Sequence, residues 1–435
     1  MTVDTRLDVD VVVLGAGLAG MAAATSAAAA GARTVVLERA AAVGGSAAIS
    51  GGYVWAIADV DTLRAEDPGQ YQRHGHLVVA GYSAAIDWLS GYLPPLTEEQ
   101  PNLAGRGRKF DLPLLFAYLT RDLYAAGGRL IPQAQTNEVA RAGDRYRLSV
   151  STPDGSRTLT ARSVVLATGG RQADPAVRAD LVGGAFVPPL RGNPWSAGTG
   201  AALAASLGAR VNTANKGFYG HLFATGLQTL SPIDYITFAL YHSSLGVLLD
   251  PDGRRFADER RGDHNNAMAL AARGGHGLLL WSEQVQQEAC APFVPNSPPM
   301  DRWAFSRDRG GRVAVVDDLA ALRPVLDSWG YSGEPRLDDE ARARLGQGRV
   351  FAADVVPAIT FTFGGIEVDD SGAVLDAAAE PIDGLFVAGA DTSDVYHQGY
   401  GGGLALAVVS GRRAGRLAAR GRTATRTSMS MSGSE

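Results

Sequence analysis

Short apolar runs alternate with a helical stretch at the start of the chain. Residues 9–14 are a Val-rich run that ends at Gly15, which predicts a strand buried on both faces. Residues 21–30 are good helix formers, and Gly31 suits the left-handed residue that ends a helix. Residues 34–37 form a second β-branched run. The pattern predicts a strand, helix, strand unit with parallel strands and a right-handed crossover.

Similar signals continue through the first half of the chain. Residues 111–126 carry apolar side chains at helical spacing and stop at two glycines, which predicts a helix. Residues 145–150 and 156–160 flank a Pro-Asp-Gly turn, and this pattern predicts a hairpin. Residues 163–167 form a short apolar run before Thr168, which predicts another buried strand.

The texture of the sequence changes between residues 185 and 351. This stretch has proline clusters, most of the histidines and four of the six tryptophans, which indicates a second domain. Strand patterns return at residues 359–362, 366–369 and 385–387, and a glycine-rich turn and a helix follow the last of them. The segment from about residue 422 is rich in Ser, Thr and Arg, which predicts a disordered tail.

Three glycines directly after the first predicted strand carry the strongest chemical signal. Gly15 permits a tight turn, Gly17 lets a pyrophosphate approach the backbone, and Gly20 allows close packing of the helix on the strand. The helix N-terminus stabilises phosphate charge. Glu38 closes the next strand and can accept hydrogen bonds from ribose hydroxyls. Together these residues predict a dinucleotide site.

A second loop of glycine and serine follows soon after Glu38 and suits a cofactor longer than a nicotinamide dinucleotide. It contains Gly44, Gly45 and Ser46, then Ser50, Gly51 and Gly52. Here the sequence resembles the FAD-dependent fumarate reductase and succinate dehydrogenase flavoprotein superfamily, of the FAD-binding-2 type, which also holds the 3-ketosteroid Δ1-dehydrogenases. The matching segments, spread from about residue 9 to 416, are VVVLGAGLAG, VVLERAAAVGGSAAISGG, SVVLATGG (163–170), GTGAALAASLGA (198–209), GVLLDPDGRRFADE (246–259) and PIDGLFVAGADTSDVYHQGYGGGLALAVVSGRRAG (381–415).

The resemblance implies an α/β fold with a Rossmann-like FAD-binding domain and an α+β capping domain. The FAD-binding domain would be discontinuous, made of residues 1–184 and 352–421, and residues 185–351 would form the cap. FAD would lie extended between them. No histidine falls in residues 44–52, where covalent members of the superfamily carry one, so we expect non-covalent FAD.

Carried over residue by residue, the resemblance places the cofactor contacts in the glycine-rich turns and loops. They are Gly15, Gly17, Gly20, Glu38, Arg39, Gly45, Ser46, Ser50, Gly51, Gly52, Thr168, Gly169, Gly389, Asp391, Gly403 and Leu404. Asp391 stands where the superfamily usually has a glutamate, and its shorter carboxylate is expected to reach the ribityl chain.

On the substrate side, residues 357–376 and the glycine-rich C-terminal motif look most like the tricarballylate dehydrogenases. Fumarate reductases carry a His-Thr-x-Gly-Gly motif here, but this chain has Phe361, which argues against fumarate itself. The substrate-binding candidates are Arg191, Tyr219, Phe361 and Thr362. Arg261, Arg344 and Arg349 are further arginines that could hold a carboxylate.

Three residues are candidates for moving the proton. His221 lies where the superfamily places a substrate-contacting histidine, and His397 and Tyr400 lie in the loop expected beside the flavin ring. A histidine titrates near neutral pH, and a tyrosine can hydrogen-bond a developing enolate. For each histidine a purely structural hydrogen bond remains the alternative.

Composition and charge narrow the class of protein. The chain has 435 residues, a net charge of −5 and 46% hydrophobic residues, which fits a globular protein and not a membrane-spanning or disordered one. The acidic balance without a basic block argues against nucleic acid as a partner. The single cysteine, Cys290, forms no internal disulfide, and no metal-ligand spacing stands out. Residues 1–10 lack a secretory pattern, so the expected location is the cytoplasm.

These observations predict an FAD-dependent oxidoreductase that dehydrogenates, or in reverse reduces, a CH–CH bond next to a carbonyl or carboxylate in a small molecule. Without a second G-x-G-x-x-G motif, electrons would pass to oxygen, a quinone or a partner protein. The alternatives are a ketosteroid-type dehydrogenase acting on a polycyclic ketone, and a flavin-binding protein without turnover. A carboxylate substrate would require a pair of arginines facing the flavin, whereas a steroid would require an apolar funnel.

Overall fold

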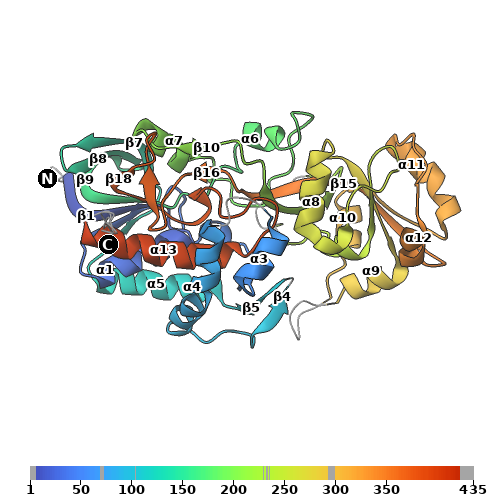
Figure 1. Ribbon diagram of the computed structural model, residues 1–435, viewed down its shortest axis with the longest axis horizontal. Coiled ribbons are helices and arrows are strands. Elements are labelled where there is room, and N and C mark those ends of the chain that lie inside the picture. The colour runs from blue at the N-terminus through green and yellow to red at the C-terminus, as the bar shows by residue number, and fades with distance from the viewer. Residues whose placement is uncertain are drawn as a thin grey trace, which may run out of the picture.

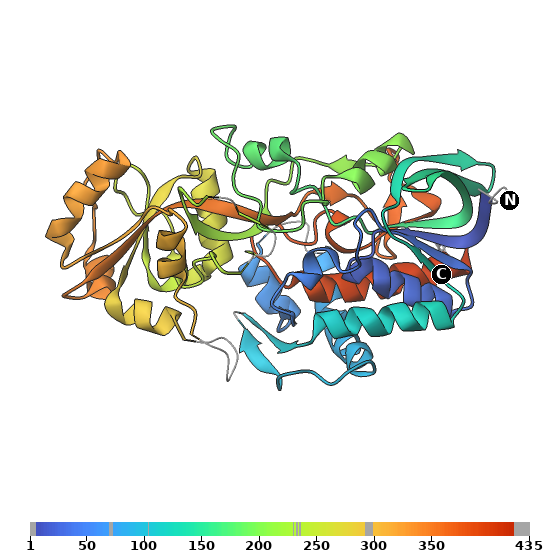
Figure 2. The ribbon, with the colours of Figure 1, turned by 180° about the vertical axis from the view of Figure 1, so that it is seen from behind.

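The computed structural model has two lobes arranged end to end along its long axis (Figures 1 and 2). It describes residues 6–68, 73–102, 104–228, 230–231, 234, 236–291 and 299–421. The predicted tail from residue 422 lies outside the described residues. The first lobe surrounds an eight-stranded sheet, and the second lobe surrounds a five-stranded sheet.

The sheet of the first lobe has the order β17-β18-β9-β1-β2-β6, with β8 pairing with β9 and β7 with β8. Its strands are β1 (Arg6–Leu14), β2 (Thr34–Leu37), β6 (Arg129–Ile131), β7 (Gln135–Ala142), β8 (Arg145–Thr152), β9 (Gly155–Leu166), β17 (Ala373–Leu375) and β18 (Pro381–Val387). The pairs β1-β2, β1-β9, β2-β6 and β9-β18 are parallel. Val11 to Val13 are fully buried, as expected of a strand covered on both faces.

The parallel strand, helix, strand unit and the hairpin are both present. Thr152 pairs with Gly155 across the predicted turn. The two strands predicted at residues 156–160 and 163–167 are a single strand, β9, and β1 pairs with it from Thr158 to Leu166. Arg162, between the two predicted runs, interrupts the apolar pattern.

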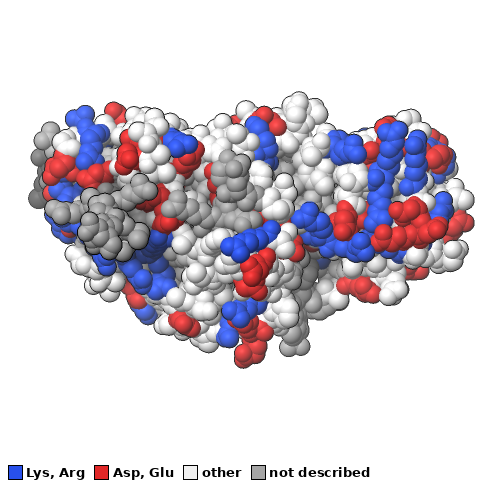
Figure 3. All heavy atoms as spheres, viewed as in Figure 1, with Lys and Arg blue, Asp and Glu red and all other residues white. Residues whose placement is uncertain are grey.

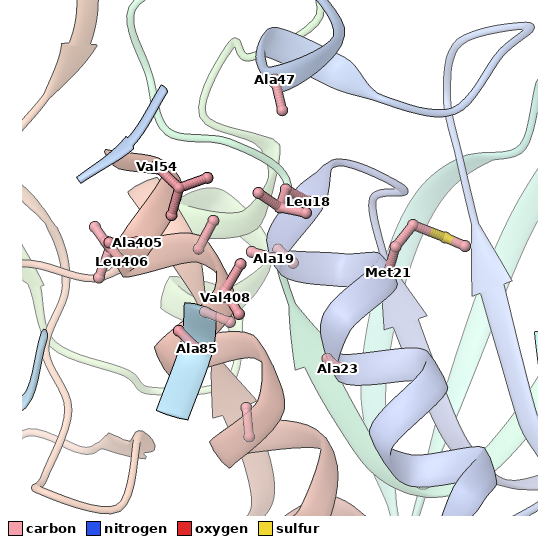
Figure 4. Packing of buried hydrophobic residues seen from close by; sticks show 14 of the residues in the cluster. Leu18, Ala19, Met21, Ala23, Ala47, Val54, Ala85, Ala405, Leu406 and Val408 are labelled. Carbon is pink, nitrogen blue, oxygen red and sulfur yellow. The ribbon is translucent and has the colours of Figure 1, made fainter. Parts of the chain in front are cut away.

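Helices from both ends of the sequence cover one face of this sheet. They are α1 (Leu18–Ala29), α5 (Leu112–Ala125) and α13 (Gly403–Arg420), and α4 (Arg73–Ser90) packs against α13. The axes of α1 and α13 lie very close, because a Cβ atom at Gly411 or Gly415 would come within 2.3 or 2.0 Å of the carbonyl oxygens of Ala19 and Ala23. Ala19 and Val408 meet between the two helices (Figure 4). Small residues on both helices therefore join the two ends of the chain in one core.

The second lobe is built on a sheet of order β11-β15-β13-β12, with β14 also paired to β15. Its strands are β11 (Phe218–Ala224), β12 (Val247–Leu249), β13 (Gly277–Ser282), β14 (Val313–Val316) and β15 (Val350–Thr362). Its helices are α8 (Asp263–Ala272), α9 (Glu283–Ala289), α10 (Arg302–Asp308), α11 (Arg323–Trp329) and α12 (Asp339–Leu345), with the short 3-10 turns η2 (Ser243–Leu245), η3 (Glu259–Arg261) and η4 (Leu319–Leu322).

The long strand β15 links the two lobes. All 13 of its residues are buried, and it runs from the second lobe to the middle of the molecule (Figures 1 and 2). The sequence pattern predicted only its last part, residues 359–362, because a fully buried strand has no alternation to reveal its start. The strand predicted at 366–369 is shorter, since β16 covers only Gly365–Ile366.

Small elements fill the space around the lobes. They are the three-stranded sheet β3 (Tyr53–Ile57), β5 (Gly105–Lys109) and β4 (Gln100–Asn102), the helices α2 (Gly45–Ala48), α3 (Val60–Glu66), α6 (Pro175–Asp180) and α7 (Thr199–Ser206), the strand β10 (Val211–Asn212) and the turn η5 (Gly389–Asp391). Helix α7 packs in the same apolar cluster as β1 and β9.

The surface mixes charges of both signs. On the face shown in Figure 3, acidic and basic side chains are interspersed, most densely over the second lobe. Arg255, Arg260 and Arg344 there all pair with Glu340. Among the described residues, no helix is long and apolar enough to cross a membrane.

Candidate active site

A cavity of about 760 Å³ opens at the carboxyl ends of the parallel strands of the first lobe and continues to the second lobe. The residues that follow β1, β2, β9 and β18 line its first part, and residues of β11, β15 and α8 line the rest. Ligands in open parallel sheets bind at this edge. The cavity thus brings together predicted residues that are far apart in the sequence.

The glycines after β1 shape the first part of the cavity. Gly15 has φ +100°, and a Cβ atom there would lie 2.3 Å from the carbonyl oxygen of Ala167. A Cβ atom at Gly17 would meet no atom closer than 4.0 Å, so this glycine faces open space at the N-terminus of α1. Gly20 does not line the cavity; its Cβ would lie 1.9 Å from the carbonyl oxygen of Gly15. It therefore allows α1 to pack closely on the turn.

Glu38 stands at the end of β2 and lines the cavity. Its carboxylate accepts hydrogen bonds from the backbone N–H groups of Ala16, at 2.6 Å, and Ala40, at 2.7 Å. Each carboxylate oxygen keeps a further lone pair for a ribose hydroxyl. Arg39, next in the chain, places its guanidinium over the ring of Trp195, 5.2 Å from the centroid, and both residues line the cavity.

The second glycine and serine loop also faces the cavity. Gly45, Ser46, Ser50 and Gly51 line it. Gly52 does not, because it occupies a turn with φ +74° where a Cβ would lie 2.4 Å from the carbonyl oxygen of Phe110.

Asp391 supports the cavity wall from behind. Its carboxylate accepts hydrogen bonds from the backbone N–H groups of Thr168, Gly169 and Gly170 and from the Thr168 hydroxyl. Burial raises the pKa of Asp391, while these hydrogen bonds act in the opposite direction. Asp391 is 2% exposed and does not line the cavity, whereas Thr168, Gly169, Gly389, Gly403 and Leu404 do.

These residues suit a bound dinucleotide. Open space in front of Gly17 and the N–H groups of α1 can take a pyrophosphate, and the lone pairs of Glu38 can take a ribose. The cavity continues past Thr168 and Gly389 toward the second lobe, which leaves room for a longer cofactor. The lining therefore fits FAD.

Two buried arginines line the far part of the cavity. Arg191, 2% exposed, donates to the Thr360 hydroxyl at 2.7 Å and to the Tyr241 hydroxyl at 2.6 Å. Arg302, 4% exposed, lies 5.0 Å from the centroid of the Tyr241 ring, and burial lowers its pKa. The sequence analysis identified Arg191 but missed Arg302, which follows a proline-rich segment without any motif. The two guanidinium groups share Tyr241 as a neighbour.

Aromatic rings line the middle of the cavity, where the lobes meet. The ring of Tyr219, from β11, stacks on that of Tyr400. The Tyr400 hydroxyl accepts a hydrogen bond from the backbone N–H of Gly403 at 2.7 Å. Phe361 on β15 lies with its ring centroid 5.8 Å from that of Tyr400. All three predicted residues therefore line one stretch of the cavity.

Two histidines in this region are neutral at pH 7. His221 is 4% exposed, and burial together with Arg191 holds the pKa of its ring well below the usual range. Its Nδ1 atom has no hydrogen-bond partner among the described residues. Burial lowers the pKa of His264 to about 4. Both rings line the cavity, and His264 was not predicted as a site residue.

Asp263, at the first turn of α8, is an acidic residue of the cavity that the sequence analysis did not predict as a site residue. Its Oδ1 atom accepts hydrogen bonds from the Ser243 hydroxyl at 3.1 Å and the Ser244 backbone N–H at 3.3 Å. Burial raises the pKa of Asp263 to about 7, against the lowering effects of Ser243, Ser244 and Arg191. No group of His, Cys, Asp and Glu within the described ranges could hold a metal ion.

Several other predicted residues lie outside the cavity lining. His397 belongs to a loop whose backbone N–H groups bind Asp67, and Thr362 is buried at the end of β15. Arg344 and Arg349 form ion pairs with Glu259 and Glu283, and Arg261 lies on the exposed turn η3. Their positions depend on long-range packing that no local pattern encodes.

Family models match most of the chain. The model described as FAD binding domain matches residues 104–404, and the model described as FAD dependent oxidoreductase matches residues 10–181. Together these segments include the glycine turns, Glu38, and Arg191 and Tyr400 of the cavity lining.

Known relatives cover almost the whole chain at low identity. The fumarate reductase (cytochrome) of Shewanella frigidimarina is 25% identical, over 95% of this chain and 77% of that protein. The 4-oxocyclohexanecarboxylate 2-dehydrogenase of Sinomonas cyclohexanicum is 23% identical, over 91% of this chain and 90% of that protein. The solved structure of 3-ketosteroid Δ1-dehydrogenase from Sterolibacterium denitrificans is similar in fold, with a TM-score of 0.72 at 16% identity over 95% of this chain and 99% of that chain.

Proposed function

Because the chain belongs to the FAD binding domain family and is an FAD-dependent oxidoreductase acting on CH–CH bonds, we propose a class of substrate for it. The proposed substrate is a small carboxylate with a neighbouring carbonyl or activated CH–CH bond. The reaction is dehydrogenation of that bond or the reverse reduction. The observation that carries the proposal is the pair Arg191 and Arg302, both buried and both lining the cavity.

The arginine pair favours an anionic ligand for an electrostatic reason. Arg binds a carboxylate through two parallel hydrogen bonds, and two guanidinium groups that line one cavity can bind the same anion. Arg191 is fixed by Thr360 and Tyr241, so its guanidinium is held in place before a ligand arrives. A second relative, the 4-oxocyclohexanecarboxylate 2-dehydrogenase, is named for a substrate with both a ketone and a carboxylate.

The chain's own residues would orient the substrate against the cofactor. FAD, when bound, supplies the hydride acceptor or donor of the reaction. The residues Gly15, Gly17, Gly45, Ser46, Thr168, Gly169 and Gly403 would hold it, with Glu38 on the ribose. Tyr400 and neutral His221 would hydrogen-bond the carbonyl oxygen and exclude water. His397 would act on loop geometry only, because it does not line the cavity.

Domain division, electron acceptor and location remain part of this proposal. We propose that residues 1–184 and 352–421 bind FAD and that residues 185–351 form the cap. Helix α7 of the proposed cap segment packs in the same apolar cluster as β1 and β9. FAD would be held without a covalent bond, and electrons would pass to oxygen, a quinone or a partner protein. No nucleic acid is expected as a partner, and a cytoplasmic location would be tested by cell fractionation.

Anaerobic visible spectroscopy tests the proposal. We expect a keto acid or a di- or tricarboxylate to bleach the flavin, or an enoate to reoxidise the reduced protein, while the matched methyl ester has no effect. Arg302→Met should raise the dissociation constant of the active carboxylate by about 100-fold, since it removes one partner of a buried charge pair. The control is Arg349→Met, whose side chain is 49% exposed.

Other outcomes of this experiment are equally informative. Bleaching by a ketosteroid, together with no response to any carboxylate, would replace the proposal with a ketosteroid-type dehydrogenase. The aromatic residues Tyr219, Tyr400 and Phe361 would then serve as the apolar wall.

A further inference from the structure

We propose that Asp263 is the catalytic residue that exchanges a proton with the substrate carbon next to the carbonyl. This inference rests on the proposed function, because it requires a carboxylate substrate held by the two arginines. Asp263 lines the same cavity as Arg191, Arg302 and His221.

The carboxyl group of Asp263 is anchored through its Oδ1 atom. This atom accepts hydrogen bonds from the Ser243 hydroxyl and the Ser244 backbone N–H, which fixes the side chain relative to α8 and η2. The Ser244 side chain acts on the same carboxyl group and lowers its pKa. The protein therefore positions a carboxyl group that lines the cavity.

The elements packed against α8 carry several charged and titratable groups, and two arginines line the same cavity. These groups are Tyr219 and His221 on β11, His242 before η2, Glu259, Arg260 and Arg261 on η3, Asp354 on β15, His264 on α8 itself, and Arg191 and Arg302. Of these, Arg191 lowers the pKa of Asp263, but burial outweighs it and raises that pKa to about 7. Asp354 is bound to His276 and Tyr331 and is thereby compensated.

Asp263 suits proton exchange better than the other titratable groups of the cavity. A general acid and base needs both protonation states near the working pH. His264, with a pKa lowered to about 4, and His221, lowered well below its usual range, are neutral at pH 7 and hold no proton to donate as imidazolium. The Asp263 carboxyl is present in both forms at that pH.

The proton step balances the hydride step. In the reducing direction, Asp263 gives its proton to the carbon next to the carbonyl while the neighbouring carbon receives a hydride from the reduced cofactor. The carbon–carbon double bond becomes a single bond, and the Asp263 carboxylate regains a proton from water. In dehydrogenation, the Asp263 carboxylate would remove the proton, and the hydride of the neighbouring carbon would pass to FAD when it is bound.

The two directions have opposite pH dependence. Dehydrogenation needs the carboxylate, so its rate should rise as the pH increases through about 7. Reduction needs the protonated acid, so its rate should fall over the same range.

The test uses Asp263→Asn in the flavin-loaded protein. Asn keeps an oxygen for Ser243 and Ser244 but cannot take or give the proton. We expect the flavin content to be unchanged and the dissociation constant of the carboxylate to stay within about threefold of wild type. The rate of flavin reduction or reoxidation should fall by about 100-fold or more, and the change of this rate with pH near 7, the pH–rate limb, should disappear. Asp339→Asn is the matched control, since Asp339 is likewise the first residue of a helix but is exposed.

A second readout does not depend on turnover. Infrared titration of the wild-type protein should show a carboxylic acid band with a midpoint near neutral pH, and Asp263→Asn should lack it. Ser243→Ala removes a hydrogen bond that lowers the pKa of Asp263, so it should move both the infrared midpoint and the pH–rate limb upward. If Asp263→Asn fails to bind flavin, this shift decides the question.

The outcomes separate this inference from the proposed function. The role of Asp263 would be overturned if Asp263→Asn kept the wild-type rate and pH–rate limb, or if Ser243→Ala left the limb unmoved. In either case, turnover of a carboxylate by the wild-type protein would still support the proposed function. A wild-type flavin that no carboxylate perturbs would overturn the proposed function and, with it, this role.

Discussion

The rings of Tyr219 and Tyr400 stack with their centroids 3.7 Å apart and their planes 17° from parallel. Tyr219 comes from β11 in the second lobe, and Tyr400 comes from the loop before α13 in the first. The contact joins the lobes at the wall of the cavity, between the glycine turns and the arginine pair. Tyr400 therefore lines the cavity where residues of the two lobes meet.

Tyr400→Phe should keep the flavin but slow its reduction by substrate. The Phe ring preserves the stack, whereas loss of the hydroxyl removes a hydrogen-bond donor for the enolate, which costs about 100-fold in rate. Rapid-mixing absorbance measures this rate, and Tyr124→Phe, at an exposed tyrosine, is the control. Unchanged kinetics would assign the carbonyl contact to another residue, with His221 the next candidate.

Gly17→Val should yield a folded but colourless protein. The backbone at Gly17, with φ −70° and ψ −179°, accepts any residue, and no protein atom lies within 4.0 Å of the added Cβ. The new side chain instead fills the space expected for the pyrophosphate. Visible absorbance of the purified variant measures its flavin content. Thermal unfolding of the variant, compared with that of the wild type freed of flavin, checks that the variant is folded. A yellow variant with full flavin would contradict this placement of the cofactor.

Asp67→Asn should destabilise the loop that carries Tyr400. Asp67 is 1% exposed and accepts hydrogen bonds from the backbone N–H groups of His397, Gln398 and Gly399. Hydrogen bonds to a charged acceptor are strong, so we expect the free energy of unfolding to fall by about 3 kcal/mol and the protein to retain flavin less tightly. Denaturant unfolding measures the loss. Asp61→Asn, at a side chain that is 91% exposed, should change stability by less than about 0.5 kcal/mol.

His242→Phe should reduce the acid sensitivity of the second lobe. Burial lowers the pKa of His242 to about 3, so the unfolded state binds a proton at higher pH than the folded state does. The stability is therefore complete above about pH 6.5 and falls as the pH drops from 6.5 toward 3.

This pH effect has a calculable size. The difference in free energy of unfolding between the variant and wild type should be about 2 kcal/mol more favourable to the variant at pH 5 than at pH 8. Fluorescence of Trp281, whose ring lies 4.7 Å from that of His242, reports the unfolding. An equal difference at both pH values would show that His242 does not titrate in this way.

The first lobe and the glycine turns that line its part of the cavity were predictable from sequence because their signals are local. Gly15, Gly17 and Glu38 act within one strand, helix, strand unit, so their spacing along the chain sets their spacing in space. Strand β2 was predicted at its observed bounds, and α1 begins three residues before the predicted start because Leu18 to Gly20 already lie in the helix.

The substrate end was less predictable because its residues meet only through tertiary packing. Arg302 and Asp263 come from helices that have no sequence motif, and they reach the cavity because their helices pack around β11 and β15. His397 shows the opposite error. Its position in the glycine-rich loop suggested a cofactor contact, but the bonds of Asp67 to that loop fix its backbone with the ring outside the cavity lining.

The close seam between α1 and α13 constrains when the protein can fold. Ala19 and Gly411, which touch across it, are separated by about 390 residues of chain, and closing so long a loop has an entropic cost. During synthesis the alanine face of α1 stays without its partner until the residues of α13 have left the ribosome. The second lobe has no such dependence for its central sheet, so it can acquire structure while the first lobe still waits for its last helix.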